Sequence, residues 1–399
     1  MTQSMQWIVR LLLVASFLAT STTHASDLVP LKLALIEYED DPRYKDAIID
    51  ARYQAQPWGR LDAAAKLAIK ESKFTAKAKG FKFELDTHEA SSLDQIPALI
   101  KRLEAEGVQY FLLDLPASGV EAVVQTSNNQ STLFNLTALD DSLRNQSCDA
   151  NLIHMAPSRR MLTDALGQYL VSKKWRKVLV LHGDSAADQN YLESLQVSAK
   201  KFGLKLVDKR LYKLGSDPRQ RYQNNIALLT AKGEYDVIYV VDSKGEFAVD
   251  VPYSVVQPRP VVGSAGLVAD WWHWAWERNG APQVNKRYHK KGKRQMTGYD
   301  WSAWLAVKVL AEAALRQDRF NPGSLRTDLL SETFKIDGAK GYPLNFRPWN
   351  NQLRQPIFLT SLNRVINRAP IEGFLHPVNN LDVLGDDVKD TQCRIGQGS

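Results

Sequence analysis

The sequence predicts an α/β protein made of two similar halves, each built around a parallel sheet. From Leu31 onward, short apolar runs alternate with stretches of helical periodicity, which is the pattern of βαβ units. The same alternation begins again after Tyr169. Because no Gly/Ser-rich linker separates the halves, we expect two Rossmann-like lobes joined by several close chain crossings.

In the first half, each apolar run is followed by a segment with helical spacing. The second helix shows the reasoning: apolar residues recur at spacings of three and four, and Pro97 is tolerated in the first turn if Asp94 is the N-cap. Strands are expected at residues 31–36, 81–85, 110–113 and 133–136. Helices are expected at residues 60–79, 93–103 and 119–126.

The second half repeats this order with equally short apolar runs. One helix has Leu192, Leu195 and Ala199 on a single face, as expected for packing on a sheet. Strands are expected at residues 177–181, 204–208, 236–241 and 261–263, with a further helix at residues 221–232.

The first 25 residues have the pattern of a cleavable secretory signal. Arg10 precedes an apolar run from Leu11 to Thr20, and small residues at Thr23 and Ala25 suit a signal peptidase. We expect cleavage after Ala25 and a periplasmic product. A membrane anchor is the alternative, although the run is shorter than the ~20 residues that span a bilayer.

The formal net charge of +7 indicates a soluble protein and does not favour nucleic acid as a partner. Basic residues crowd the segment 286–294, and acidic residues cluster at Asp382, Asp386, Asp387 and Asp390. No aromatic ladder interleaves the basic segment, as single-strand binding would require. Solvated loops are the alternative interpretation of both clusters.

The chain has two cysteines, Cys148 and Cys393. An even count in an exported protein favours a disulfide, which would join the C-terminal tail to the middle of the chain. Two free buried thiols are the alternative. The spacing excludes a C-x-x-C redox or zinc site.

Several strings, taken in order, resemble the type I periplasmic binding proteins, and more narrowly the branched-chain amino-acid receptors of ABC importers. They are residues 110–118 (YFLLDLPAS), 136–138 (LTA), 155–158 (MAPS) and 298–300 (GYD), together with a return from Gly341 to Phe346. Further strings resemble a subgroup associated with pyrroloquinoline-quinone-dependent alcohol oxidation. These are residues 263–270 (GSAGLVAD), 272–274 (WHW), 280–283 (GAPQ) and 300–304 (DWSAW).

The resemblance implies two lobes linked by a three-crossover hinge, with the ligand between them at the carboxyl ends of the strands. The implied divisions are 1–25 for the signal peptide, 28–139 plus 255–337 for lobe one, 140–254 plus 340–375 for lobe two, and 376–399 for a C-terminal tail.

Two loops of the first half offer hydrogen-bond donors to a ligand anion. Ala117 and Ser118 follow the third expected strand just before a helix, whose N-terminus favours negative charge. Thr137 and Ala138 follow the fourth strand in the same way. Helix or turn capping is the alternative role for Ser118 and Thr137.

Acidic side chains follow strands of the second half at Asp184, Asp242 and Glu246. The resemblance implies that Glu246 is where an amino-acid receptor holds the ligand ammonium group. However, residues 242–245 (DSKG) replace that family's small and aromatic residues, so amino-acid specificity does not follow.

Aromatic residues supply the remaining candidates. On a helix, Trp271 and Trp274 would share one side, while Trp272 and Trp276 would share another. One pair would then enter the core, and the other would face the cleft or a partner; Trp271 is the candidate for the ligand site. Tyr38, at the end of the first strand, is a similar candidate. The alternative is that all five pack structurally.

The chain has no nucleotide-binding, metalloprotease or nucleophile-elbow motif. His182 lies close to Asp184, but such a pair is more often a loop hydrogen bond than a catalytic base. We therefore expect no enzymatic activity, no cofactor and no metal site. The resemblance implies a small-molecule ligand and an ABC permease as partners. An exported accessory or sensor protein that docks a quinoprotein dehydrogenase is the alternative.

Overall fold

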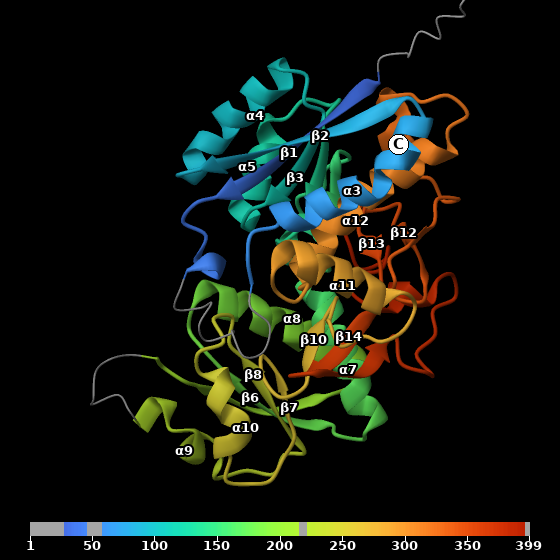
Figure 1. Ribbon diagram of the computed structural model, residues 1–399. Coiled ribbons are helices and arrows are strands. Elements are labelled where there is room, and N and C mark those ends of the chain that lie inside the picture. Colours follow the sequence, from blue (N-terminus) through green and yellow to red (C-terminus); the bar gives the residue numbers. More distant parts are fainter. Residues whose placement is uncertain (1–27, 46–57, 215–221, 396–399) are drawn as a thin grey trace, which may run out of the picture.

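The molecule contains two parallel sheets that lie at opposite ends of an elongated body (Figure 1). The computed structural model describes residues 28–45, 58–214 and 222–395. The first sheet has the order β2-β1-β3-β4-β5, and the second has the order β7-β6-β8-β9. All neighbouring strands within these two sheets run parallel. The predicted α/β class with two parallel sheets is confirmed.

The first sheet is covered by helices on both faces, as parallel sheets require. Alternation along β1 places Leu33 and Leu35 against α3 and α12, and Ala34 and Ile36 against α4 and α5. The strands are β1 (Val29–Tyr38), β2 (Phe81–Ala90), β3 (Tyr110–Asp114), β4 (Thr132–Asn135) and β5 (Leu152–His154). The helices are α3 (Asp62–Ala78), α4 (Ile96–Ala105), α5 (Ala117–Thr126), α11 (Ala281–Gly292), α12 (Gly298–Arg316) and α13 (Leu325–Leu329).

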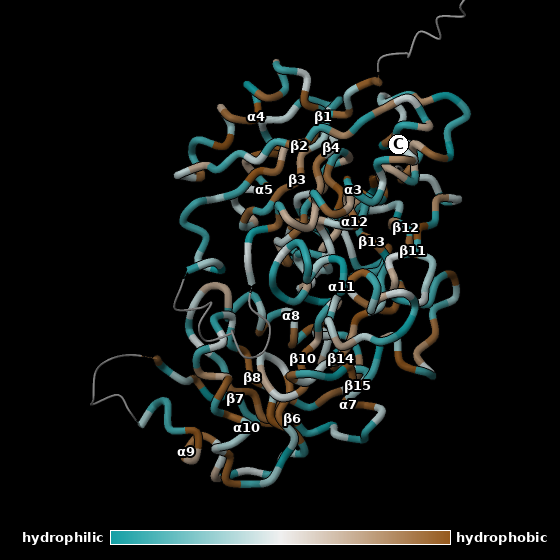
Figure 2. Tube along the Cα trace, viewed as in Figure 1, coloured by the Kyte–Doolittle hydropathy of each residue, from teal (hydrophilic) through white to brown (hydrophobic). Residues whose placement is uncertain are grey.

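The second sheet is built in the same way. Val178 and Val180 of β6 pack on the side of α7 and α8, while Leu179 and Leu181 pack on the side of α10. Its strands are β6 (Lys177–His182), β7 (Lys205–Leu211), β8 (Val237–Val241) and β9 (Val261–Gly263), and its helices are α7 (Arg159–Ser172), α8 (Ala186–Phe202), α9 (Ile226–Thr230) and α10 (Val251–Ser254). Figure 2 shows hydrophobic residues concentrated along the strands in the middle of each lobe.

Antiparallel strands complete the region between the lobes. A three-stranded sheet of order β10-β14-β15 contains β10 (Val268–Asp270), β14 (Ile357–Ser361) and β15 (Arg364–Ala369). A second one, β11-β12-β13, contains β11 (Ile336–Asp337), β12 (Pro343–Phe346) and β13 (Leu353–Arg354). These strands were not predicted; β10, β11 and β13 have only two or three residues each, too few to show a period of two.

Two strands join the opposite sheet from the one that the expected lobe divisions imply. β5 pairs with β4 in the first sheet, and β9 pairs with β8 in the second. Both lie where the chain passes from one lobe to the other, so each completes the sheet that it is leaving. A helix was predicted at residues 221–232. Among the described residues of that range, the only α-helix is α9, which is five residues long.

The signal peptide, residues 1–25, lies outside the described residues. Across residues 28–45, 58–214 and 222–395, no helix has the length and apolarity needed to cross a bilayer.

The basic segment 286–294 is the exposed end of α11 and its C-terminal turn, although Arg287 and Arg294 pair with Glu71 and Asp300.

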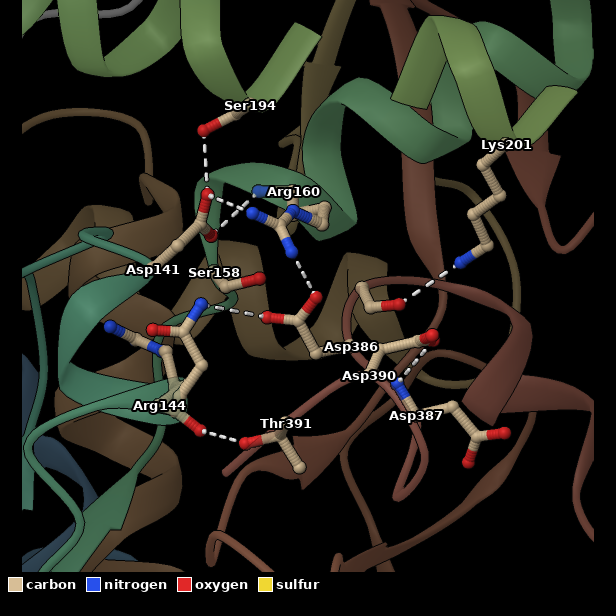
Figure 3. Close-up of polar contacts among 12 residues, drawn as sticks. Asp141, Arg144, Ser158, Arg160, Ser194, Lys201, Asp386, Asp387, Asp390 and Thr391 are labelled. Atoms are coloured by element: carbon tan, nitrogen blue, oxygen red, sulfur yellow. Dashed lines mark hydrogen bonds and ion pairs between the residues drawn. The ribbon is translucent and has the colours of Figure 1, made fainter. Parts of the chain in front are cut away.

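The acidic tail is not a solvated loop, contrary to that interpretation of its charges. Asp382 is buried between Arg347 and Arg354, whose Nε atoms lie 2.9 and 2.8 Å from Asp382 Oδ1. Asp386 is also buried and pairs with Arg160 (Figure 3). Cations contributed by residues distant in sequence explain why these carboxylates can be buried.

The tail is attached to both lobes. The predicted disulfide between Cys148 and Cys393 is present, with Cα atoms 5.5 Å apart and a sequence separation of 245. Lys201 Nζ on α8 of the second lobe donates to the carbonyl oxygens of Val383 (2.8 Å) and Gly385 (3.0 Å) (Figure 3 shows Lys201 above the tail). The C-terminal segment therefore lies across the side of the molecule where the chain crosses between lobes.

Candidate ligand-binding site

A cavity of about 300 Å³ lies between the two lobes. The second lobe contributes Arg159 at the start of α7 and Tyr191 on α8. Residues 297–299 at the start of α12 line it from the first lobe, and β10 and the end of β14 contribute from the connecting sheet. The cavity therefore has walls from both lobes, which is what a site that closes around a ligand requires.

Aromatic rings form one wall of the cavity. Tyr299 is contacted edge-on by Trp58 and by Trp271, with ring centroids 5.1 and 4.9 Å away. The indole N–H of Trp271 donates to Ser302 Oγ at 3.0 Å, which fixes the ring against α12. A Cβ at Gly298 would lie 2.6 Å from the Trp271 ring, so this position has no space for a side chain. The wall is therefore rigid and suited to a flat apolar group.

The start of α12 is held by a capping box. Thr297 Oγ1 accepts from the amide of Asp300, and the Asp300 carboxylate accepts from the amide of Thr297 at 2.8 Å. Arg294 and Tyr288 also bind the Asp300 carboxylate. These bonds position Tyr299 in the wall of the cavity.

Arg159 supplies positive charge to the opposite wall. Its guanidinium carbon lies 5.0 Å from the centroid of the Tyr191 ring. The neighbouring Arg160 pairs with Asp386, whereas no carboxylate of the described residues lies within ion-pair distance of Arg159. The side chain is only partly exposed. Its charge therefore remains available to an anion that enters the cavity.

Two carboxylates also line the cavity, and both accept hydrogen bonds from the backbone. Asp242, which follows β8, accepts from the amides of Gly245 and Ala248, both at 2.9 Å. Asp270 accepts from the amide of Trp272 at 3.3 Å. The Asp242 carboxylate therefore shapes the turn after β8, and its oxygens are already engaged.

His273 is a neutral group in the cavity wall. It is 3 % exposed, and burial lowers its pKa to about 4, although a backbone hydrogen bond to Leu362 partly opposes this shift. Nδ1 accepts from the amide of Ala275 at 3.1 Å, so the proton of the neutral ring is on Nε2. Near neutral pH this side chain adds no charge to the site.

We expect the protein to lose stability as the pH falls below 6.5, in part because of His273. The unfolded state gains a proton near pH 6.5, whereas the folded state resists protonation down to about pH 4. Stability is therefore present above pH 6.5 and is lost on acidification, by about 2 kcal/mol from this group at pH 5. Burial also lowers the pKa of His154, which acts in the same direction.

Denaturant unfolding of His273→Gln at pH 7 and pH 5 tests this expectation. The variant should lose less stability between the two pH values than the parent does. His289→Gln is the matched control, because His289 is exposed on α11. An unchanged pH dependence in His273→Gln would contradict the assignment.

The structure places Asp242 and Trp271, of the residues predicted from sequence, in the cavity wall. The tryptophan segment 271–276 is not helical, so the assumed angular pairs are wrong. Trp271 and Trp272 are both buried and donate to different partners, Ser302 and Asn285. Helical geometry is interrupted here because the side chains of Asp270 and His273 accept hydrogen bonds from the backbone amides two residues further on.

The other predicted site residues lie outside this cavity: Tyr38, Ala117, Ser118, Thr137, Ala138, Asp184 and Glu246. The amides of Thr137 and Ala138 donate to Asn135 Oδ1 at 3.2 and 2.9 Å, so these donors are already used. Ala117 and Ser118 begin α5, and Asp184 and Glu246 are exposed. Tyr38 ends β1, where its carbonyl accepts from Arg60 at 2.9 Å.

At the carboxyl ends of the first-lobe strands, the protein supplies its own counter-ions. Arg43 Nη2 lies 2.6 Å from Asp114 Oδ1 at the end of β3, and Arg43 also pairs with Asp41. Tyr44 Oη donates to Asp114 Oδ2 at 2.7 Å. Arg43 therefore has its counter-ions within the first lobe, and Arg159 of the second lobe is the only Lys or Arg among the described residues that line the cavity.

Sequence reasoning missed Arg159, Tyr191, Tyr299 and His273. The only signal for Arg159 was its place directly after the string 155–158 (MAPS), which ends in the N-cap of α7. Tyr191 and Tyr299 are 108 positions apart, and no local pattern joins them to His273.

Comparison with known proteins places this geometry in a wider context. Residues 54–228 match a family model described as periplasmic binding protein. A periplasmic binding protein from Burkholderia mallei superposes with a TM-score of 0.67 at 14% identity, covering 93% of this chain and 100% of that one. This chain has the type I periplasmic-binding-protein fold.

Other solved structures share the type I periplasmic-binding-protein fold at similarly low identity. An ABC transporter substrate-binding protein from Sphaerobacter thermophilus has a TM-score of 0.68 at 14% identity, covering 90% of this chain and all of that one. A solute-binding protein of an ABC transporter from Rhodopseudomonas palustris, in complex with 3,4-dihydroxybenzoic acid, has a TM-score of 0.62 at 15% identity, covering 83% of this chain and 93% of that one. No curated protein sequence matches this chain. The matched family consists of binding proteins, in agreement with the expectation that this chain is not an enzyme.

Proposed function

We propose that this protein is the periplasmic solute-binding component of an ABC importer, and that it holds a small carboxylate with a flat apolar body between its lobes. The observation that carries the proposal is Arg159, a cation without a counter-ion among the described residues, facing a cavity with an aromatic wall. A carboxylate would pair with the guanidinium, while its ring or hydrocarbon part would lie against Trp271 and Tyr299.

The cavity favours an acid over an amino acid. An amino acid needs an acceptor for its ammonium group, but Glu246 is exposed and does not line the cavity. Asp242 and Asp270 do line it, but both carboxylates accept hydrogen bonds from backbone amides. The aromatic acid bound by the Rhodopseudomonas palustris relative is a ligand of the proposed class.

Transport requires that the lobes close and that a membrane permease recognise the closed form. The lobe divisions 28–139 plus 255–337 and 140–254 plus 340–375 remain part of the proposal, with β5 and β9 assigned by their pairing. The link to pyrroloquinoline-quinone-dependent alcohol oxidation depends only on the strings at residues 263–270, 272–274, 280–283 and 300–304. A role as accessory to a quinoprotein dehydrogenase depends on the same four strings.

Titration calorimetry with benzoate, 3,4-dihydroxybenzoate and isoleucine tests the proposal. We expect an aromatic acid to bind, and Arg159→Met to weaken that binding roughly ten- to a hundredfold, because a hydrogen bond to a charged group contributes about 1.5–3 kcal/mol. Arg159→Lys should retain part of the affinity, since the charge remains but the bidentate geometry is lost.

The control variant is Lys173→Met, which removes one charge at the other end of α7, outside the cavity. It should bind like the parent protein. Equal affinity of Arg159→Met and the parent for the bound acid would place the site elsewhere. Binding of isoleucine in preference to both acids would contradict the ligand class.

A further inference from the structure

A second hollow, larger than the cavity, lies on the outer side of the tryptophan segment. This groove has a volume of about 1140 Å³ and lies between α11, β15 and residues 274–278. The groove and the interlobe cavity have no lining residue in common. Both take residues from the tryptophan segment and from the β14–β15 hairpin. The groove is therefore a separate surface feature from the proposed solute site.

Aromatic residues form part of the groove. Trp276 packs on Phe358 of β14 with ring centroids 4.9 Å apart. Arg368 lies over the Trp276 ring at 5.5 Å and over Tyr342 at 4.6 Å, and Arg278 lies 6.0 Å from the Trp276 ring. The indole N–H of Trp276 is buried, and no described residue accepts a hydrogen bond from it. The groove therefore combines the planar surface of an aromatic ring with the positive charge of the neighbouring arginines.

The groove also carries a strong excess of cations. Lys286 and Lys290 are at positions i and i+4 of α11 and share one face. Arg278, Arg364 and Arg368 add three guanidinium groups, whereas Glu277 is the single carboxylate among the described residues that line the groove. Within the described ranges, no carboxylate lies within ion-pair distance of Lys286, Lys290, Arg278 or Arg364.

This arrangement differs from ordinary surface charge. Arg287, on the same helix but outside the groove, pairs with Glu71, and Arg294 after the helix pairs with Asp300. Among the described residues, Lys286, Lys290, Arg278 and Arg364 have no such partners. Like charges gathered in a concave surface repel one another and concentrate anions from solution. An occupant with several negative charges would relieve that repulsion.

We propose that this groove is a second binding site, for a small polyanion that carries a planar ring. The ring would pack beside Trp274 and Trp276, and its carboxylate or phosphate groups would pair with Lys286, Lys290 and Arg364. The site does not depend on the solute proposed for the cavity, because Arg159 is absent from it.

Titration calorimetry at low salt with benzene-1,2,4,5-tetracarboxylate tests the site, with tricarballylate as the acid without a ring. We expect one molecule of the aromatic polyanion to bind per chain, and tricarballylate to bind at least tenfold more weakly. The double variant Lys286→Gln/Lys290→Gln should weaken binding of the aromatic polyanion tenfold or more. ADP in place of the tetracarboxylate distinguishes phosphate from carboxylate as the preferred anion.

The matched control is Lys200→Gln/Lys205→Gln, which removes two exposed charges from the second lobe. It should bind the polyanion like the parent. Arg159→Met should also leave polyanion binding unchanged, so failure of the solute proposal and failure of this one are distinguishable. The proposal is overturned if neither the tetracarboxylate nor ADP binds. It is also overturned if the groove variant and the control bind the tetracarboxylate equally well.

Discussion

Replacing Asp382 by Asn is expected to lower the free energy of unfolding by about 3–5 kcal/mol. The carboxylate lies between Arg347 and Arg354, which are 1% and 9% exposed in their side chains. Asn keeps the shape of the side chain but leaves two guanidinium groups without their counter-ion in a buried place. Removing one partner of a buried ion pair costs more than the pair itself contributes, because the remaining charge is desolvated.

Denaturant unfolding of Asp382→Asn and the parent measures this effect. Asp390→Asn is the control, because Asp390 belongs to the same acidic tail but is exposed. We expect the control to remain within about 0.5 kcal/mol of the parent, as surface substitutions usually do. If Asp382→Asn is equally stable, the two arginines have other compensation and the account of the buried tail is wrong.

Removing the disulfide is expected to have a similarly large effect. In the chain-entropy model, closing a loop as long as the one between Cys148 and Cys393 contributes about 5 kcal/mol, less any strain in the folded state. The double variant Cys148→Ala/Cys393→Ala should therefore unfold at a clearly lower denaturant concentration than the parent. Mass spectrometry of the unreduced parent should show the two cysteine peptides linked.

Dithiothreitol provides the control for this prediction. Reduction should lower the unfolding midpoint of the parent to that of the double variant, and should leave the variant unchanged. A midpoint that does not move in either case would show that the tail is held by its polar contacts alone. Those contacts include the bonds of Lys201 to the carbonyl oxygens of the tail.

The central strands of both sheets were predictable because their signal is local. β3 and β8 are runs of five residues that are buried at every position, as expected for strands covered on both faces. β5 and β9 contain only three residues each, and their sheet membership is decided by pairing with strands distant in sequence. No pattern within such a short segment carries that information.

The candidate site was less predictable than the fold. The position of Asp242 after a strand was correct, but its carboxylate is used by the backbone of the following turn. The tryptophan segment was treated as a helix, whereas side-chain bonds to the backbone prevent helical spacing there. Arg159 became a candidate only when the tertiary structure showed which arginines have partners, since Arg160 beside it is paired.

The tryptophan segment separates the two hollows and belongs to both. Trp271 and His273 line the cavity, while Trp274 and Trp276 line the groove; residues 360–362 and 363–368 divide the β14–β15 hairpin in the same way. The two hollows therefore share one segment of the chain, although their lining residues differ. If an occupant of one hollow changes the affinity of the other, thermodynamic linkage requires that the reverse effect have the same factor.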